Sequence, residues 1–286
     1  MKHSSLKQLM VGLAGTGKTT FLAALWHVVS RGDIPSGLRL KEFPNNREYL
    51  NKISSDWLNC KPLGRTVPEF EKIVSMKLED SESKDVIEVW FPDLSGETFR
   101  VQLRSRQWTA GYCELAKEAE GITLFIHPNI VVPPTRIDEV ESIVREIGSH
   151  EEVAEDSKVE AQNLWNIDKM SIQAKLVELL QFHVNSPYCE SIRRIAVVIS
   201  AWDLVMDYTE SPEKWLEKTL PFLDQFLKAN RERFSFRIYG VSAQGAELKN
   251  ACLLLGKINP EERIIIVGEE CIPHDITVPV KWLMRG

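Results

Sequence analysis

Residues 12–19 read Gly-Leu-Ala-Gly-Thr-Gly-Lys-Thr, a full match to the pattern GxxxxGK[ST]. The apolar segment 6–12 before it predicts a buried strand, and residues 19–30 predict a helix with an apolar face. Glycines allow the backbone to turn so that successive N–H groups converge on an anion. A glycine-rich turn before an ordinary helix is the alternative, but the Lys-Thr pair favours a phosphate-binding loop (P-loop). The chain is therefore predicted to bind a nucleotide here.

The pattern assigns roles to individual residues of this loop. Lys18 would neutralise charge between the β- and γ-phosphates, and the Thr19 hydroxyl would ligate Mg²⁺. The dipole of the helix that begins at Thr19 would also favour the anion. The predicted nucleotide-binding residues of the loop are Gly12, Ala14, Gly15, Thr16, Gly17, Lys18, Thr19 and Thr20.

A second motif follows a predicted hairpin. Residues 71–78 and 86–91 read as strands joined by a polar turn over 80–85. The second strand runs into Pro-Asp-Leu-Ser-Gly-Glu, in which Asp93 would reach Mg²⁺ through water and the N–H of Gly96 would approach the γ-phosphate. Asp and Gly are also common turn residues, so an ordinary turn is the alternative. Two antiparallel strands ending in DxxG resemble Ras-like GTPases, whereas AAA-type and RecA-type ATPases usually carry Asp-Glu there.

A third segment predicts a site for the base. Residues 195–199 (Ile-Ala-Val-Val-Ile) read as a buried parallel strand that runs into Ser200 and Asp203. The Asp203 carboxylate would accept hydrogen bonds from N1 and N2 of guanine, which adenine cannot supply; alternatively, Asp203 caps a helix. Guanine-binding proteins usually carry Asn or Thr at the position of Ser200, and at that of Ala201 a Lys whose stem covers the base. Trp202 would either stack on a ligand or pack in the core.

A further strand is predicted over 237–241, and it leads to Ser242, Ala243 and Gln244. These three residues resemble the Ser-Ala-Lys loop that contacts guanine in GTPases, with Gln244 in place of the lysine. The predicted residues around the base are therefore Ser200, Asp203, Ser242 and Ala243.

The same comparison with GTPase motifs predicts the catalytic positions. Thr66 is the candidate for the threonine that contacts Mg²⁺ and the γ-phosphate, and Arg65 is either a cis-acting arginine finger or a surface residue. Glu97 stands where a water-orienting Gln often follows DxxG, and its charge beside a triphosphate predicts slow hydrolysis. Alternatively, Glu97 is simply a favourable acidic residue in the first turn of a helix. The predicted catalytic set is Lys18, Thr66, Gly96 and Glu97, and the predicted metal ligands are Thr19, Thr66 and Asp93.

In chain order these motifs resemble the set found in GTPases of the TRAFAC (Ras-like) class. More narrowly, VGLAGTGKTTFLAALW, PDLSGETF, SIQAKLVELLQ and the C-terminal ITVPVKWLM resemble the bacterial double-GTPase (DO-GTPase) families of conflict systems. The resemblance implies an α/β P-loop NTPase fold, with a mostly parallel sheet, one antiparallel strand, flanking helices and a helical insertion. It also implies GTP or GDP and Mg²⁺ as ligands, slow hydrolysis in a molecular switch, and a role in antiphage defence. An ATPase, a P-loop kinase and a nucleotide-binding module without hydrolysis stay open, because several positions depart from the guanine pattern.

Composition limits the remaining classes of function. The 286 residues are 43% hydrophobic and 27% charged, as in globular proteins, and the net charge of -6 argues against a general nucleic-acid surface. Five cysteines without a CxxC pair fit a reducing compartment, and no signal peptide or membrane segment is visible, so a cytoplasmic location is predicted. One domain is predicted over 1–286, with an acidic helical insertion at about 135–188. The switch regions or this insertion would bind partner proteins.

Apolar spacing predicts the remaining elements. Single helices are expected over 46–59, 98–119, 211–231 and 279–284. Strands are expected over 121–127 and, at a sheet edge, over 263–267. No repeat or low-complexity segment divides the chain.

Overall fold

The structure is a computed structural model that describes residues 6–32, 34–63, 73–92, 96–131, 170–185, 192–250 and 259–284, without the side chains of 96–98 and 100. In these ranges a single sheet has the strand order β2-β3-β4-β1-β5-β6-β7-β8. The strands are β1 (Leu6–Gly12), β2 (Leu38–Glu42), β3 (Ile73–Asp80), β4 (Val86–Pro92), β5 (Gly121–Ile126), β6 (Arg194–Ser200), β7 (Ser235–Ser242) and β8 (Ile265–Val267).

The strand directions confirm the predicted mixed, mostly parallel sheet. Strand β1 pairs in parallel with β4 and β5, and β5–β6 and β6–β7 are parallel as well. Strand β3 is the expected antiparallel strand of the hairpin with β4. The predicted edge strand is present as β8, which runs antiparallel to β7. Strand β2 lies at the opposite edge of the sheet and pairs antiparallel with β3. The spacing of apolar residues in the sequence did not indicate this strand.

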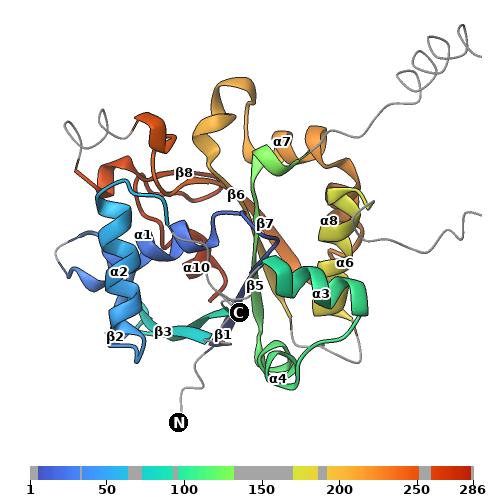
Figure 1. Cartoon of the computed structure of the whole chain (residues 1–286), viewed down its shortest axis with the longest axis horizontal. Helices are drawn as coiled ribbons and strands as arrows, with labels where there is room; N and C mark the ends of the chain where they lie inside the picture. Colours follow the sequence, from blue (N-terminus) through green and yellow to red (C-terminus); the bar gives the residue numbers. More distant parts are fainter. Residues whose placement is uncertain are drawn as a thin grey trace, which may run out of the picture.

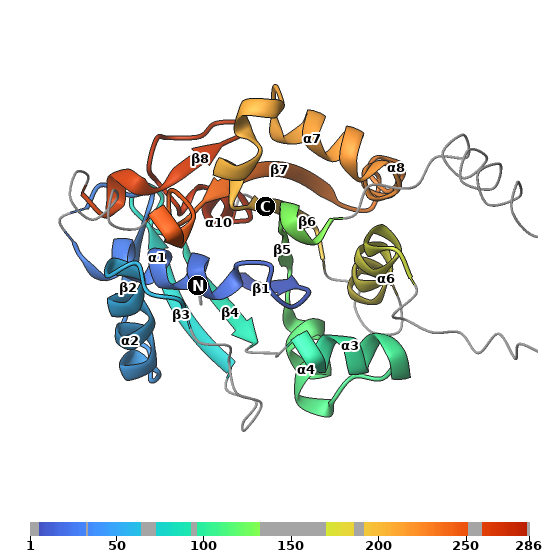
Figure 2. The ribbon, with the colours of Figure 1, turned by 45° about the horizontal axis from the view of Figure 1, so that its top comes forward.

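Helices cover both faces of this sheet (Figures 1 and 2). One face carries α1 (Lys18–Ser30), α2 (Arg47–Leu58) and α10 (Val278–Trp282). The other carries α3 (Gly96–Ser105), α4 (Ala110–Glu118), α6 (Ile172–Val184), α7 (Pro212–Thr219) and α8 (Pro221–Ala229). No helix within the described ranges has both the length and the apolar character to cross a lipid bilayer.

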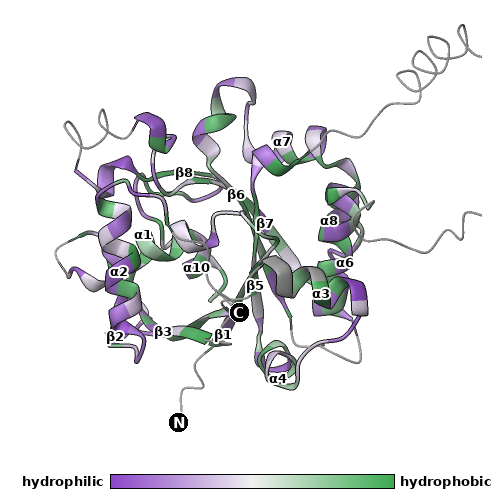
Figure 3. Cartoon of the chain, in the orientation of Figure 1, coloured by the Kyte–Doolittle hydropathy of each residue, from purple (hydrophilic) through white to green (hydrophobic). Residues whose placement is uncertain are grey.

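Alternating side chains of the central strands supply two separate cores. In β6, Ile195, Val197 and Ile199 pack on the face of α6 to α8, whereas Ala196 and Val198 pack on the face of α1. A strand covered on both faces must be apolar at every position, which explains the β-branched run. Figure 3 shows the result: the central strands are mostly hydrophobic, and hydrophilic residues gather on the outer helices.

Two of the predicted helices are each split, so the single-helix predictions were wrong. Residues 98–119 form α3 and α4, because Arg106 adopts a positive φ of 54° and Thr109 starts a new helix by accepting from the Tyr112 N–H. Residues 211–231 form α7 and α8, because Pro221 has no N–H to continue the first helix and suits the first turn of the next. The helices expected over 46–59 and 279–284 are confirmed as α2 and α10.

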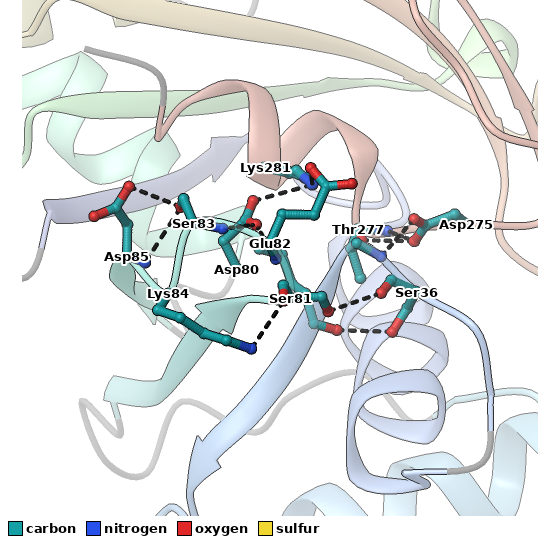
Figure 4. A network of polar contacts seen from close by, with 12 residues as sticks. Ser36, Asp80, Ser81, Glu82, Ser83, Lys84, Asp85, Asp275, Thr277 and Lys281 are labelled. Atoms are coloured by element: carbon teal, nitrogen blue, oxygen red, sulfur yellow. Dashed lines mark hydrogen bonds and ion pairs between the residues drawn. The ribbon is translucent and has the colours of Figure 1, made fainter.

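Polar contacts tie the C-terminal helix to the β2–β3 side of the sheet (Figure 4). The Lys281 ammonium lies 3.0 Å from the Asp80 carboxylate at the end of β3. Nearby, Asp275 accepts from the Gly37 N–H at 2.8 Å and from the Thr277 hydroxyl at 2.6 Å. Burial alone would raise the pKa of Asp80, but backbone N–H donors of the following turn and Lys281 outweigh burial and hold that pKa below 3.8. The last described segment is therefore part of the core structure.

A buried histidine joins α4 to α6. The His183 Nδ1 contacts the Leu179 carbonyl at 2.6 Å, and its Nε2 lies 2.6 Å from the Tyr112 hydroxyl. Because a carbonyl can only accept, Nδ1 donates to it, and in the neutral ring Nε2 then accepts from the Tyr112 hydroxyl. Burial lowers the pKa of His183 from 6.5 to about 4, and the hydrogen bond to Leu179 offsets only part of this effect.

We expect His183 to make the stability of the fold depend on pH. As the pH falls from 6.5 toward 4, His183 binds a proton in the unfolded chain but stays neutral in the folded chain. The free energy of unfolding should fall by on the order of 3 kcal/mol across this window. Urea denaturation of wild type and His183→Gln at several pH values checks this, because only the wild type loses this contribution. A difference between the two proteins that stays constant from pH 7 to pH 4.5 would contradict the prediction.

Candidate functional site

The parallel strands bring several predicted residues to one edge of the sheet. In adjacent strands Gly12 pairs with Phe125, Ile126 with Ile199, and Ser200 with Val241. The carboxyl ends of β1, β5, β6 and β7 therefore lie side by side. Ligands of open α/β sheets bind at this edge.

The loop after β1 is held in shape by its own lysine. The Lys18 ammonium donates to the carbonyls of Gly12 at 2.7 Å and Leu13 at 2.8 Å. The Thr16 hydroxyl also donates to the Leu13 carbonyl, at 2.8 Å, and its side chain is buried. Lys18 further lies over the Phe99 ring of α3, 5.5 Å from its centroid. The loop thus folds around the cationic group predicted to bind phosphate.

A glycine at the end of the loop starts α1. Gly17 is the N-cap residue at a φ of 82°, and no described side chain caps this helix. A Cβ on Gly17 would lie 3.1 Å from the Ser200 hydroxyl oxygen, a tight contact that a larger residue would relieve only by displacing Ser200. Ser200 in turn donates to the Ile126 carbonyl at 3.1 Å. Ser200 therefore packs between the end of β5 and the phosphate-binding loop.

The carboxylate of Asp203 is held by the neighbouring strand. The Ser242 hydroxyl donates to Asp203 Oδ1, and the Gly245 N–H donates to the same hydroxyl at 3.1 Å. Asp203 lies inside the short helix Trp202–Leu204, whose N-cap is Ala201, and no described side chain caps that helix. The alternative that Asp203 caps a helix is therefore wrong. Trp202 is buried in the core, which decides the alternative left open for it.

A cavity of about 220 Å³ connects these elements. Six predicted residues line it: Gly17, Thr20, Ser200, Asp203, Ser242 and Ala243. The other predicted residues of the loop are not part of its lining: Gly12, Ala14, Gly15, Thr16, Lys18 and Thr19. The volume is below the ~300–1,000 Å³ of sites for drug-sized ligands. A cavity of this size suits one end of a nucleotide.

Sequence reasoning missed part of the lining. His127 and Asn129 follow β5, and the rule that ligands bind at strand ends could have found them. Lys61 and Leu63, which follow α2, line the same cavity, and no local signal marked them. Burial lowers the pKa of His127 below 6.5, and the attraction of Asp203 offsets only part of this. His127 also accepts a hydrogen bond from the Asn129 N–H at 3.1 Å.

Several predicted site residues lie outside the described residues. They include Thr66, Arg65 and Asp93, which the hypothesis assigns to the metal and the γ-phosphate. The backbone of Gly96 and Glu97 forms the first turn of α3, but the Glu97 side chain is not described. Within the described ranges no three or more His, Cys, Asp or Glu side chains could hold a metal ion by themselves.

Gly240 of β7 gives room to the helix that carries Asp203. A Cβ at position 240 would lie 2.3 Å from the Trp202 ring, a distance that forces the ring to move. Gly240→Ala should lower the free energy of unfolding by about 1–3 kcal/mol through this overpacking. Urea denaturation measures the loss, with Gly32→Ala as control, because described atoms leave open space within 4 Å there. Equal stabilities of the two variants would contradict the prediction.

Comparison with known proteins adds to this geometry. The profile of a family described as Double-GTPase 1 matches residues 9–283. No curated protein matches the chain.

Similar solved structures are larger than this chain. Bacterial selenocysteine-specific elongation factor EF-Sec has 15% identity and a TM-score of 0.39, with 91% of this chain and 30% of that chain covered. The Methanosarcina barkeri Roco2 RocCORdC bound to GDP has 13% identity and a TM-score of 0.32, with 87% and 47% covered. The S. cerevisiae Ski7 GTPase-like domain, bound to GDP and inorganic phosphate, has 14% identity and a TM-score of 0.43, with 90% and 52% covered. The chain thus spans about half or less of each.

Proposed function

The chain belongs to the Double-GTPase 1 family, and from that premise we propose that it binds GTP and GDP with Mg²⁺, hydrolyses GTP slowly and acts as a molecular switch. The observation that carries this proposal is the continuity between the loop around Lys18 and the cavity around Asp203. Gly17 belongs to both, because it ends the loop and lines the cavity. One nucleotide would therefore place its phosphates at Lys18 and its base at Asp203.

The phosphate end would rest on charge and on backbone donors. Lys18 supplies a cation that the loop already orients through two carbonyl contacts. The first turn of α1 presents N–H groups at the same place, and no described side chain caps them. The remaining loop residues, Gly12, Ala14, Gly15 and Thr16, would surround the β-phosphate with their backbone.

The base end would be read by the Asp203 carboxylate. Ser242 occupies one carboxylate oxygen and thereby fixes the orientation of the group. A carboxylate accepts several hydrogen bonds, so acceptor capacity remains for the N1 and N2 hydrogens of guanine. Adenine presents no such pair of donors at that edge. The free acceptor capacity of Asp203 therefore favours guanine, although Ser200, Ala201 and Gln244 differ from the residues usual in guanine-binding motifs.

Magnesium would be bound mainly through the nucleotide. Mg²⁺ in nucleotide sites takes one or two protein ligands together with phosphate oxygens and water. Thr19, in the first turn of α1, fits such a role, and Thr66 and Asp93 are proposed as the further protein contacts. When bound, the ion would neutralise charge on the β- and γ-phosphates.

Hydrolysis would depend on how this chain positions water. Lys18 and the loop backbone would hold the γ-phosphate, with Thr66 and the Gly96 N–H as proposed contacts. Glu97 is proposed at the water-orienting position, where its negative charge beside the triphosphate makes the reaction slow. A protein partner at the switch regions or at the insertion of about 135–188 would then raise the rate or respond to the bound state. A place in antiphage conflict systems, in the cytoplasm, is part of this proposal.

Isothermal titration calorimetry with GTP, GDP and ATP in the presence of Mg²⁺ tests the binding proposal. We expect GTP and GDP to bind at least about tenfold more tightly than ATP, since one lost base contact is worth about 1–3 kcal/mol. Equal or tighter binding of ATP would overturn the guanine assignment and leave an ATPase.

Single-turnover phosphate release tests hydrolysis separately. With enzyme in excess over GTP and Mg²⁺ present, the wild type should release phosphate slowly but completely. The Lys18→Ala variant should stay at background. Wild-type release no faster than that of Lys18→Ala would instead identify a binding module without hydrolysis.

A further inference from the structure

Lys61, three residues beyond the end of α2, lines the same cavity as Asp203 although 142 positions separate them in the sequence. We infer that Lys61 is a specificity-determining residue that donates to the O6 and N7 edge of guanine, while Asp203 accepts from the N1 and N2 edge. This inference rests on the proposed binding of guanine nucleotides. It adds a residue that belongs to none of the motifs of the chain.

The charges of the cavity support this role. Among its described lining residues only Lys61 and His127 are basic, and burial keeps the pKa of His127 below 6.5. At neutral pH the lining therefore combines one cation with the carboxylates of Asp203 and Glu247. Guanine matches such a pair, because O6 and N7 accept hydrogen bonds and N1 and N2 donate them. Adenine carries a donor, N6, where guanine has the acceptor O6, so adenine would offer the ammonium only N7 and would place an N–H group against it.

The end of α2 is attached to the loop that follows β7. The indole N–H of Trp57, a fully buried residue, donates to the Ala243 carbonyl at 2.9 Å. The Gln244 amide donates to the Cys60 sulfur at 3.2 Å and lies 3.4 Å from the Trp57 carbonyl. Lys61 follows Cys60 directly, so these contacts hold its backbone at the rim of the cavity.

A buried arginine completes this attachment. The Arg263 guanidinium donates to the Cys60 sulfur at 2.8 Å and lies over the Trp57 ring, 4.9 Å from its centroid. Arg263 is only 3% exposed, so its charge is poorly screened. A lysine at position 244 would bring a second cation close to this guanidinium, which gives a physical reason for Gln244 there. With position 244 used to hold α2, Lys61 remains as the cation of the cavity lining.

Calorimetry on Lys61→Met tests the inference, because methionine keeps an unbranched apolar side chain and removes the donor. The ratio of ATP to GTP dissociation constants should fall about tenfold, the effect of one charged hydrogen bond to a base edge. Binding of inorganic tripolyphosphate should not change, since this probe has no base. Lys61→Arg should keep the wild-type ratio. Lys52→Met, an exposed lysine of α2 that does not line the cavity, is the matched control.

A second variant tests the attachment of α2. Gln244→Ala removes the amide donor, and the ATP-to-GTP ratio should fall in the same direction, with tripolyphosphate binding intact. A ratio in Lys61→Met equal to that of wild type, in a protein that does prefer GTP, would overturn the inference and leave the proposed function standing. A wild type without any preference for guanine would overturn both.

Discussion

Replacing Lys18 with alanine should weaken the binding of GTP and GDP by about a hundredfold or more and abolish hydrolysis. Lys18 has two roles that alanine cannot supply. It holds the loop together by donating to the carbonyls of Gly12 and Leu13. It would also neutralise the β- and γ-phosphates through charge-assisted hydrogen bonds, which contribute about 1.5–3 kcal/mol each. The larger figure corresponds to a factor of roughly 100 in affinity.

Calorimetry with GDP and single-turnover phosphate release with GTP measure the two effects of Lys18→Ala. The matched control is Lys84→Ala, an exposed lysine in the turn between β3 and β4. Its ammonium donates to the nearby Ser81 carbonyl at 2.8 Å. Circular dichroism should show both variants folded. GDP affinity in Lys18→Ala within about threefold of the control would mean that the phosphates do not bind at this loop.

Replacing Asp203 with asparagine should move the preference of the site from guanine to xanthine nucleotides. The carboxylate of Asp203 only accepts hydrogen bonds, which matches the N2 amino group of guanine. The asparagine amide also donates, and xanthine carries a carbonyl oxygen where guanine carries N2. The amide oxygen can still accept from the Ser242 hydroxyl, so the local structure should survive the change.

We expect GTP binding to weaken by about a hundredfold in Asp203→Asn, with xanthosine triphosphate becoming the tighter ligand. A contact made by two hydrogen bonds to a base favours the right base over the wrong one by about 1–3 kcal/mol. In Asp203→Asn this contact to guanine is lost, and the amide N–H group also faces the N2 amino group, which weakens GTP binding further. Competition binding against a labelled guanine nucleotide measures both affinities. Asp207→Asn is the control, since Asp207 is exposed and does not line the cavity. An unchanged preference for GTP over xanthosine triphosphate would remove Asp203 from base recognition.

Much of the fold could be predicted because the signals are local. The apolar run 195–199 and the alternation in 86–91 identify β6 and β4, since strand type depends on side-chain period and β-branching. The predicted helices over 98–119 and 211–231 were too long. Apolar spacing continued across both breaks, whereas the backbone at Arg106 and the missing N–H of Pro221 ended the helices.

Part of the candidate site could likewise be predicted from local patterns, and part of it could not. The glycine pattern before Lys18 implied a phosphate-binding loop, and the strand ends implied which residues stand beside it, because both depend on spacing along the chain. The buried packing of Trp202 and the hydrogen bond from Ser242 to Asp203 needed two strands to meet. No local pattern contains such information.

The amino-acid sequence by itself therefore determined most strands of the sheet, the loop around Lys18 and the order of the motifs. Only the tertiary structure decided that Lys61 shares a cavity with Asp203. The physical reason is distance along the chain. The hydrogen bond from Trp57 to Ala243 joins residues 186 positions apart, and such a contact arises from the packing of whole elements.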